Sequence, residues 1–396
     1  MSEWKKVKLG ELYEVHNGLS KGRQFFGTGF PFLTFSNVFN NWFLPDQLES
    51  LVQTTDKERE ACSIKAGDVF ITRTSETMDE LGMSSVALKD YPNATYNGFT
   101  KRLRPITDRV NPRYIGYYLR TPKFRGQFMA FSSMTTRASL ANNDLLNMEV
   151  ELPPMETQHR IATILSRYDS LIENYQKQIK LLEEAAQRLY KEWFVDLHFP
   201  GHENTNIVDG VPEGWEKKKL HEIAEVVMGS SPKSEFYNND KQGLPFHQGV
   251  GSYGTRFVDD NVYSTSITRL AEPNSILFSV RAPVGRLNIT KNKIIIGRGL
   301  AAMNHKDGFQ SFLFYMLKDR FFMDNIIGNG SIFASISKVE LLDQEFIVPP
   351  MKTIMAFESL ASKLDKIIQG VDTQLRLLTE ARDRLLPKLM SGEMAV

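Results

Sequence analysis

The sequence has a single cysteine, Cys62, in 396 residues. One cysteine excludes an internal disulfide framework and any metal site built on a Cys-x-x-Cys motif, so we expect Cys62 to be a small buried apolar residue. No apolar run approaches the roughly 18 residues that a membrane span needs, and no secretory signal pattern is present. These absences predict a cytoplasmic protein that does not contact a membrane.

Catalytic motifs are absent as well. No Gly-x-x-x-x-Gly-Lys-Ser/Thr phosphate loop occurs. Pro153-Pro154 lacks the flanking residues of an adenine methyltransferase motif, and Pro45-Asp46 is not followed by the Asp/Glu-x-Lys of a nuclease. His198 and His202 have the spacing of a helical zinc pair, but Pro200-Gly201 between them opposes a helix. We therefore expect no catalytic residue, no metal and no bound cofactor.

The charge is nearly balanced but unevenly distributed. The formal net charge is +1, yet residues 99–137 hold nine basic side chains against one acidic one, and residues 269–298 hold six against one. Aromatic residues alternate with the basic ones in the first stretch. This combination is typical of nucleic-acid-binding surfaces, and a solvated basic face is the alternative. Because such a stretch occurs in each half of the chain, we favour nucleic-acid binding.

Two long helices are predicted from apolar residues at alternating spacings of three and four. This spacing forms a seam, the line of side chains that packs against a partner helix in a coiled coil. About 37 helical residues make a rod of about 55 Å, too long to lie on one small domain. The first seam comprises Ile161, Leu165, Tyr168, Ile172, Tyr175, Ile179, Leu182, Ala186, Leu189 and Trp193; the second comprises Phe357, Ala361, Leu364, Ile368, Val371, Leu375, Leu378, Leu385 and Leu389, with Arg382 as its polar position.

The helices belong to an internal repeat. Leu378 follows Leu182 by 196 residues, and the two seams coincide at this offset. The opening at Trp4 returns at Trp215, 211 residues later, so the second copy is about 15 residues shorter within its globular part. A long core helix, or a coil that joins two chains, is the alternative. Two equivalent helices in one chain favour an intramolecular antiparallel coiled coil, with two domains related by an approximate two-fold axis.

Each copy also contains short apolar segments between turns, which predict strands. The clearest are residues 68–75 and 275–285, and short helices are expected at 112–119 and 309–317. Paired prolines before Met155 and Met351 fix an extended chain just before each long helix. The predicted fold class is α+β. Its parts are residues 1–152 (first domain), 153–197 (first long helix), 198–214 (linker), 215–348 (second domain) and 349–396 (second long helix).

The order of these features resembles the specificity subunit of type I restriction-modification systems, over nearly the whole chain. The resemblance rests on the Trp-x-x-x-x-Leu-x-Glu openings at Trp4 and Trp215, the strands Gly67-Asp68-Val69-Phe70 and 276–285, the segment Leu152-Pro153-Pro154-Met155-Glu156-x-Gln158-x-x-Ile161, and the closing Leu385-Leu-Pro387-Lys388-Leu389-Met-Ser391-Gly392-Glu393. The second copy lacks the glutamine, so the start of its helix is expected to pack or bind a partner differently.

The resemblance implies two target-recognition domains, each reading one half of a bipartite double-stranded DNA target, with the helices as a ruler for the spacer. It implies that this chain performs no chemistry. Two methyltransferase subunits would bind S-adenosylmethionine and methylate adenine, and a restriction subunit that uses ATP and Mg would join through them, in defence against foreign DNA.

Several alternatives remain open. Within the family, the same architecture could serve a methylation-only or other non-type-I restriction complex. A stand-alone nuclease or methyltransferase conflicts with the missing motifs. A coiled-coil protein scaffold would not need two basic, strand-rich domains.

DNA contacts are expected from loop residues, because phosphates attract Lys and Arg, and base edges are read by Arg, Asn, Gln, Ser and Thr. A solvated surface or a structural hydrogen bond is the alternative for each. The candidates are Lys21, Arg23, Arg73, Thr74, Ser75, Lys101, Arg102 and Arg137 in the first domain, and Ser231, Lys233, Gln248, Arg281, Arg286 and Arg298 in the second.

Overall fold

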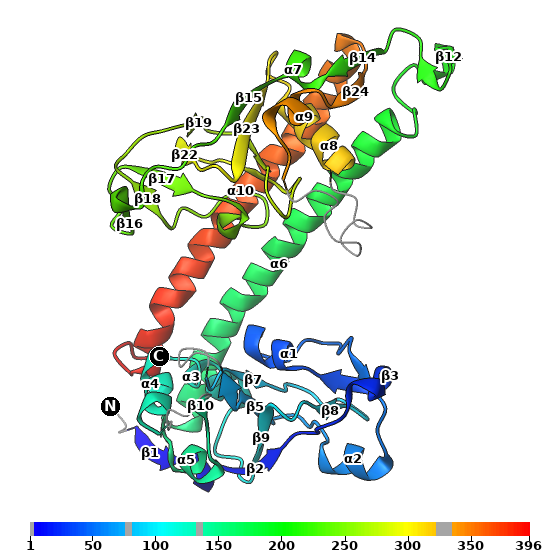
Figure 1. Ribbon diagram of the computed structural model, residues 1–396. Coiled ribbons are helices and arrows are strands. Elements are labelled where there is room, and N and C mark those ends of the chain that lie inside the picture. Colours follow the sequence, from blue (N-terminus) through cyan, green and yellow to red (C-terminus); the bar gives the residue numbers. More distant parts are fainter. Residues whose placement is uncertain (1–3, 76–80, 132–137, 322–334) are drawn as a thin grey trace. The chain divides into compact units, whose positions relative to one another are not determined.

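The computed structural model describes residues 4–75, 81–131, 138–321 and 335–396. The chain forms two compact units. The first comprises Met1–Asn174 and Leu375–Val396, and the second comprises Tyr175–Gln374. Each long helix contributes residues to both units rather than forming a body of its own (Figure 1).

The first unit is built on a four-stranded antiparallel sheet. Its spatial order is β2 (Tyr13–Asn17), β9 (Thr100–Pro105), β5 (Val69–Thr72) and β7 (Ser84–Val86). Strand β5 is buried along its whole length, since Val69 pairs with Leu103 on one side and with Val86 on the other. The smaller sheets are β4 (Leu51–Val52), β3 (Phe26–Leu33) and β8 (Thr95–Tyr96); β1 (Lys5–Lys8) with β11 (Glu149–Leu152); and β6 (Thr74–Ser75) with β10 (Ala138–Ser139).

Helices cover these sheets and lead into the first long helix. Their bounds are α1 (Phe35–Asn40), α2 (Asp56–Ala61), α3 (Pro112–Tyr118), α4 (Pro122–Phe131), α5 (Asn142–Asn147) and α6 (Met155–Phe194). Helix α3 begins cleanly because Asn111 accepts hydrogen bonds from two backbone N–H groups of its first turn and Pro112 occupies its first position.

The second unit repeats this plan. Its main sheet has the order β15 (Ala224–Met228), β23 (Leu300–His305), β20 (Ile276–Ser279) and β21 (Leu287–Ile289). The other strands are β16 (Tyr237–Asn238), β18 (Tyr263–Ser264), β17 (Leu244–His247), β22 (Ile294–Ile296) and β19 (Leu270–Ala271) in one sheet, and β14 (Glu216–Lys219) with β24 (Glu345–Val348) in another. The helices are α7 (Leu220–Ile223), α8 (Gln310–Phe321), α9 (Lys338–Leu342) and α10 (Met351–Met390).

Strand pairing confirms the predicted repeat. Strand β1 pairs antiparallel with β11 just before α6, and β14 pairs in the same way with β24 just before α10. In the smaller sheets, β3 pairs antiparallel with β4 and parallel with β8, and β17 pairs antiparallel with β18 and parallel with β22. The α+β fold class and the strands and short helices expected from the sequence are therefore confirmed.

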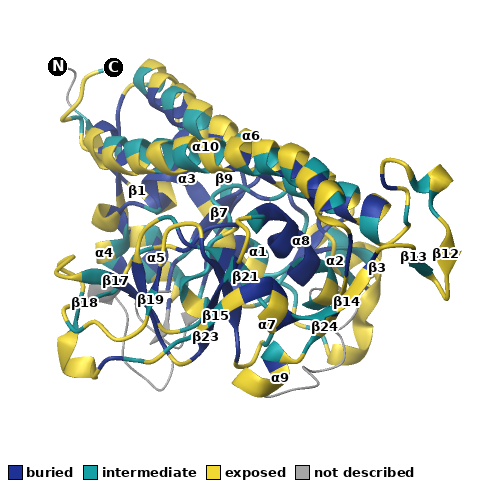
Figure 2. Cartoon of the chain, turned by 90° about the horizontal axis from the view of Figure 1, so that it is seen from above, coloured by how far each residue is buried: buried dark blue, intermediate teal, exposed yellow. Residues whose placement is uncertain are grey.

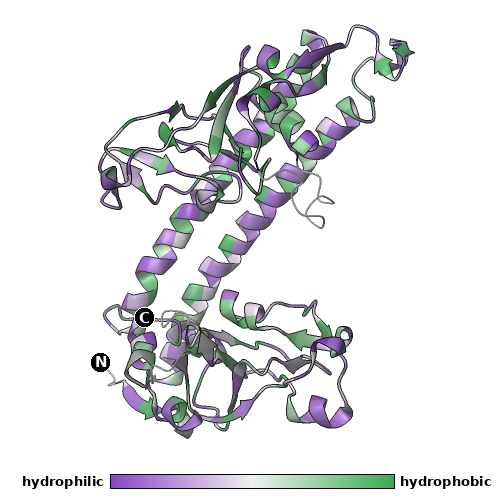
Figure 3. Cartoon of the chain, in the orientation of Figure 1, coloured by the Kyte–Doolittle hydropathy of each residue, from purple (hydrophilic) through white to green (hydrophobic). Residues whose placement is uncertain are grey.

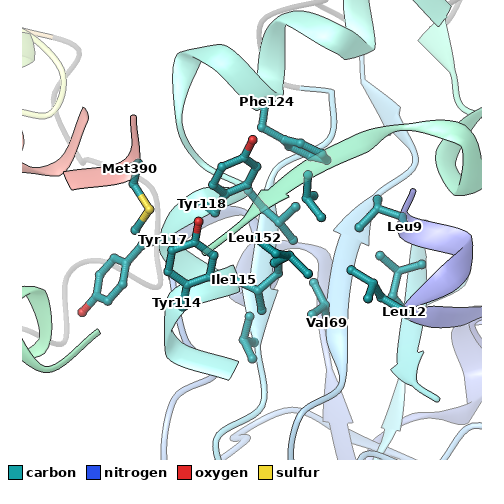
Figure 4. Close-up of a cluster of buried hydrophobic side chains, with 14 of the residues drawn as sticks. Leu9, Leu12, Val69, Tyr114, Ile115, Tyr117, Tyr118, Phe124, Leu152 and Met390 are labelled. Carbon is teal, nitrogen blue, oxygen red and sulfur yellow. The ribbon is translucent and has the colours of Figure 1, made fainter. Parts of the chain in front are cut away.

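The core of each unit joins a strand-rich domain to the long helices. In the first unit, the tyrosines of α3 pack with Leu9, Leu12 and Val69 of the domain and with Met390 of α10 (Figure 4). The buried residues of the second core include Trp193 from α6 and Phe357 from α10. This shared burial explains why each unit contains helix segments as well as strands.

The contacts between α6 and α10 show that the two helices run antiparallel. In the first unit, Leu165 near the start of α6 shares a core with Leu386 near the end of α10. In the second unit, Tyr190 late in α6 shares a core with Phe357 early in α10. Every predicted seam residue is buried or half-buried, as a seam that packs against a partner helix requires. Buried and exposed positions, and apolar and polar ones, accordingly alternate along both helices (Figures 2 and 3).

The predicted linker holds a small structure of its own. A 3-10 turn at His202–Asn204 precedes a two-stranded hairpin of β12 (Ile207–Val208) and β13 (Val211–Pro212). Phe199 anchors its beginning, since its ring centroid lies 5.1 Å from that of Trp215. Cys62 is buried and free, as predicted.

Neither a membrane-spanning helix nor a metal-binding cluster is found among the described residues. No helix among them combines the length and the apolar character that crossing a membrane requires. Within the same part of the chain, no cluster of three or more His, Cys, Asp or Glu residues is arranged to hold a metal ion.

Candidate nucleic-acid interface

Three predicted DNA-binding residues of the second domain meet at one place. The loop after β15 carries Ser231, the loop after β17 carries Gln248, and the loop between β22 and β23 carries Arg298. The Ser231 hydroxyl donates to Gln248 Oε1 at 2.8 Å and accepts from the backbone N–H of Arg298 at 3.1 Å. We call this arrangement the three-loop junction.

Backbone contacts hold the junction together. The N–H of Ser230 donates to the carbonyl of Ile296 at 2.9 Å, and the N–H of Gly297 donates to the carbonyl of His247 at 2.8 Å. The loops cross so closely that a Cβ atom on Gly229 would lie 2.1 Å from the carbonyl oxygen of Gly297. Only glycine fits at this crossing, because the obstructing atom is itself backbone.

A buried histidine fixes the second loop of the junction. His247 directly precedes Gln248 and is almost fully buried. Its Nδ1 lies 2.7 Å from the Ser252 hydroxyl and its Nε2 lies 3.0 Å from Asp260 Oδ1. With both ring nitrogens engaged, the imidazole holds the end of β17, and therefore Gln248, in a defined position.

The side chains at the junction suit the recognition of base edges. Gln248 and Arg298 are exposed, while Ser231 is half-buried between them. An arginine guanidinium matches the acceptors of guanine and a glutamine amide matches adenine in the major groove. The arrangement can thus present a rigid pair of hydrogen-bonding groups to a ligand.

The first domain contains the same junction with different side chains. The N–H of Leu19 donates to the carbonyl of Tyr96 at 2.8 Å, and the N–H of Asn97 donates to the carbonyl of Leu33 at 3.0 Å. A Cβ atom on Gly18 would lie 2.2 Å from the carbonyl oxygen of Asn97, which matches the crossing at Gly229. The backbone geometry is therefore common to both domains.

The groups presented by the first junction are Ser20, Asn97 and Phe99. Ser20 is exposed and Phe99 is 56 % exposed, while the Asn97 side chain accepts from the backbone N–H of Phe99 at 2.6 Å. An exposed phenylalanine can contact a thymine methyl group or stack on a base. Sequence reasoning did not select these residues, although the glycines at equivalent places in both copies were a usable signal.

Lys21 and Arg23 lie next to this junction on a loop with aromatic residues. The Lys21 ammonium donates to the carbonyl of Gln53, forms an ion pair with Glu58 at 2.8 Å and lies 5.0 Å from the Phe25 ring centroid. Its hydrogen bond, followed by one from the Thr55 backbone, lowers the pKa of Glu58 to about 2. Arg23 is exposed. Lys21 therefore orders the loop, and Arg23 is the cation that the loop presents.

Two of the predicted DNA-binding residues point inward instead. Arg102 is only 2 % exposed and donates to the carbonyl of Ser63 at 2.7 Å. Lys101 is also buried and donates to the Asn142 side chain; burial, and then the nearby charge of Arg73, lowers the pKa of Lys101. A buried side chain has no surface for DNA, so this burial argues for structural roles for both. The cause is strand β9, which is covered on both faces.

The remaining first-domain candidates are placed only in part. Arg73 is half-buried, and its backbone N–H donates to the carbonyl of Phe99 at 3.0 Å, close to the junction. Thr74 and Ser75 form β6, which pairs with β10, but their side chains lie outside the described part of the structure. Arg137 also lies outside the described residues.

The other second-domain candidates are not part of the contacts that join Ser231, Gln248 and Arg298. Lys233 is exposed and forms a long ion pair of 3.9 Å with Glu235. Arg281 is exposed at the turn that follows β20. Arg286 is half-buried and lines a cavity of about 380 Å³ together with Arg256. Whether these three contact DNA stays a prediction.

Comparison with known proteins shows the family of this chain. The family described as "Type I restriction modification DNA specificity domain" matches residues 1–184 and 212–379, one match for each copy of the repeat. This chain therefore belongs to the type I restriction-modification DNA specificity family.

Individual relatives span the whole chain. The type I restriction enzyme MjaIX specificity subunit of Methanocaldococcus jannaschii is 28 % identical and aligns with 100 % of this chain and 94 % of its own length. The type I restriction enzyme HindI specificity subunit of Haemophilus influenzae is 21 % identical, with 99 % and 100 % covered. The crystal structure of a type I restriction-modification S subunit from M. genitalium has the same fold, with a TM-score of 0.59 at 15 % identity over 98 % of this chain and 96 % of that one. The chain is thus a DNA-specificity subunit in fold and in family.

Proposed function

We propose that this chain is the non-catalytic DNA-recognition subunit of a type I restriction-modification complex, and that each domain reads one half of a bipartite target through its three-loop junction. The observation that carries the proposal is the repetition of the junction. A Cβ atom built on either crossing glycine, Gly18 or Gly229, would lie at nearly the same distance from a backbone carbonyl oxygen in the two domains. The side chains held there differ, as they must if the two halves of the target differ in sequence.

Phosphate contacts would come from exposed cations beside each junction. Arg23 in the first domain and Lys233 and Arg281 in the second are exposed on loops. Such contacts position a protein on the duplex without reading its sequence, while Gln248 and Arg298 supply groups suited to base edges. Positioning and readout would therefore be carried by separate side chains.

The chemistry would belong to partner subunits. We expect two methyltransferase subunits, one for each domain and its helices, which bind S-adenosylmethionine and methylate adenine, and a restriction subunit that uses ATP and Mg. Relatives named as type I restriction enzyme specificity subunits support this assignment. Such a complex would act on DNA in the cytoplasm. A methylation-only complex, or another non-type-I restriction complex, remains the alternative within the family.

Methylome sequencing of host DNA, with and without this chain, tests the proposal. Loss of methyladenine at one bipartite motif is expected when the chain is deleted. Restoring the chain as Gln248→Ala or Arg298→Ala should relax or change one half of that motif and leave the other half intact. Equal changes at both halves would contradict the assignment of one junction to each half-site.

A direct assay separates this function from that of a stand-alone enzyme. The purified chain is incubated with duplex DNA and S-adenosylmethionine, and in parallel with Mg. We expect no cleavage by the chain alone, and no methyl transfer until a methyltransferase subunit is added. Methylation or cleavage by the chain alone would overturn the non-catalytic role.

A further inference from the structure

In each unit, an aspartate of a long helix accepts a hydrogen bond from a tyrosine of the domain's own short helix. In the first unit, Asp169 of α6 accepts from Tyr117 of α3. In the second, Asp365 of α10 accepts from Tyr315 of α8 at 2.8 Å. Asp365 follows Asp169 by 196 residues, the offset that relates the two helices. The two aspartates are therefore the same site in the two copies.

The cation at this site comes from a different element in each copy. In the first unit it is Arg382 of α10, whose Nη1 lies 3.0 Å from Asp169 Oδ1. In the second unit it is Arg256 of the domain, whose Nη2 lies 2.7 Å from Asp365 Oδ1. Arg256 is 1 % exposed, and its guanidinium lies 3.5 Å from the Phe314 ring centroid. One copy thus neutralises the aspartate from the neighbouring helix, and the other does so from the domain.

At the position equivalent to each arginine, the other copy has a different residue: Trp42 stands in place of Arg256, and Ala186 in place of Arg382. Trp42 occupies the backbone position of Arg256, because its carbonyl accepts from Val86 in β7 as that of Arg256 accepts from Ile289 in β21. The Arg382 guanidinium lies 5.7 Å from the Trp42 ring centroid. Ala186 of α6, 196 residues before Arg382, is buried and leaves room at the equivalent helix position. A Trp–Arg pair in one copy therefore corresponds to an Arg–Ala pair in the other.

A second pair of equivalent positions differs in the same way. At the start of α6, Gln158 is buried and its side chain accepts from the backbone N–H of Asn111, the residue that caps α3. The equivalent residue of α10 is the buried, apolar Ile354. There the cap is Glu358 of α10 itself, which accepts from two backbone N–H groups of α8 at 3.2 and 2.9 Å. Each domain is thus tied to its long helix by its own set of polar contacts.

We propose that these residues form a matching code that allows each recognition domain to dock only on its own part of the helix pair. The second domain placed against Asp169 would set Arg256 beside Arg382, which already pairs with Asp169 and with the neighbouring Asp383. The first domain placed against Asp365 would bring Trp42 to Ala186 and leave the aspartate without a cation. Both mismatches are unfavourable, because like charges repel and a half-buried carboxylate without a partner is destabilising.

The consequence rests on the proposed function. If each domain has its own docking site, the order in which the two half-sites are read is fixed by helix residues as well as by the domains. Exchange of a domain between the two positions would then require exchange of the helix residue that matches it.

Compensating substitutions in the full chain test the code without DNA, so its failure is distinguishable from failure of the proposed function. Arg256→Trp and Ala186→Arg are made singly and together, and thermal unfolding and hydrogen exchange of α8 are measured. Each single variant should lower the unfolding temperature by roughly 5–10 °C and speed exchange in α8. The double variant recreates the arrangement of the first unit and should recover at least half of that loss. The matched control is Arg320→Trp, since Arg320 is an exposed arginine of α8. This variant should change the unfolding temperature and the exchange of α8 little.

The reciprocal cycle uses Trp42→Arg and Arg382→Ala in the first unit. If a single variant does not fold, a folded double variant still supports the code, since only a matched pair can rescue it. The code would be overturned if the losses in unfolding temperature of the single variants simply add in both double variants. It would also be overturned if the single variants were as stable as Arg320→Trp.

Discussion

The three-loop junction can be tested by adding one methyl group to it. Gly229→Ala would place a Cβ atom 2.1 Å from the carbonyl oxygen of Gly297 and 2.8 Å from its carbonyl carbon. The Gly229 backbone is not in the left-handed region, so alanine can adopt its conformation and the effect is purely steric. Because real Cβ contacts are not shorter than 3.0 Å, the two loops must separate.

The loss of stability can be estimated from the backbone hydrogen bonds that break when the loops separate. The loops must move apart by roughly 1 Å, which is enough to stretch the bond from Ser230 N–H to the Ile296 carbonyl beyond hydrogen-bonding distance. One or two backbone hydrogen bonds at about 1 kcal/mol each, together with overpacking, give a loss of roughly 1–3 kcal/mol in the free energy of unfolding. For a unit of this size, that corresponds to a fall of roughly 3–10 °C in Tm.

The assay compares this variant with Gly251→Ala in the same domain. A Cβ atom on Gly251 would meet no atom within 4 Å, so this control should retain the Tm of the unaltered chain. Gly229→Ala should also weaken binding to the second domain's half-site roughly 5-fold or more, because displacing the Ser231 loop removes at least one base contact of roughly 1–3 kcal/mol. A Gly229→Ala chain as stable as the control, or one that loses both half-sites equally, would refute the reasoning.

Three further predictions address individual side chains. Arg298→Ala should raise the Kd for one half-site roughly 5- to 150-fold if the guanidinium reads a base, and should instead reduce the salt dependence of binding if it contacts a phosphate; fluorescence anisotropy at several salt concentrations separates the two. Arg102→Ala should lower the free energy of unfolding in urea by roughly 1–3 kcal/mol, because buried carbonyl groups lose their donor; a loss of DNA binding at unchanged stability would contradict its structural role. The Glu58 carboxyl should titrate near a pKa of 2 by NMR, below its ordinary value of 4.5, so the stability it contributes is present above pH 4.5 and is lost as the pH falls toward 2; a titration near 4.5 would show that the Lys21 pair does not persist in solution.

Periodicity made the scaffold predictable. The seam from Ile161 to Trp193, and its copy from Phe357 to Leu389, set the length of each helix and the face that packs, and every seam position is at least half-buried. The repeated openings at Trp4 and Trp215 predicted two equivalent domains, and the sheet orders agree. These features depend on spacing along the chain, which a sequence displays directly.

The site was harder to predict because it depends on which way a side chain points. Lys101 and Arg102 were selected for their charge, but β9 lies between covered faces, so both side chains are buried. Ser231, Gln248 and Arg298 were selected independently, and the fold brings them together. No spacing rule links three loops whose residues are 17 and 50 positions apart along the chain.

The docking contacts of Arg256 and Arg382 could not be predicted from the sequence for a different reason. Arg256 follows its equivalent, Trp42, by 214 residues, whereas the openings are related by 211 and the helices by 196. Changes in loop length between the copies therefore hide the correspondence. The residue types differ as well, so only the shared backbone contact to β7 or β21 reveals that the positions are equivalent.

In each junction, backbone atoms hold the loops together and side chains present the binding groups, so the specificity can change while the loops keep their positions. The loop crossings at Gly18 and Gly229 are made by backbone atoms, so side chains such as Gln248 and Arg298 can be replaced without loss of the frame that holds them. The docking sites have the opposite property, because Arg256 and Arg382 must match residues on another element. Substitution within a junction should therefore alter a half-site freely, whereas exchange of a whole domain should succeed only when Ala186 or Arg382 is exchanged with it.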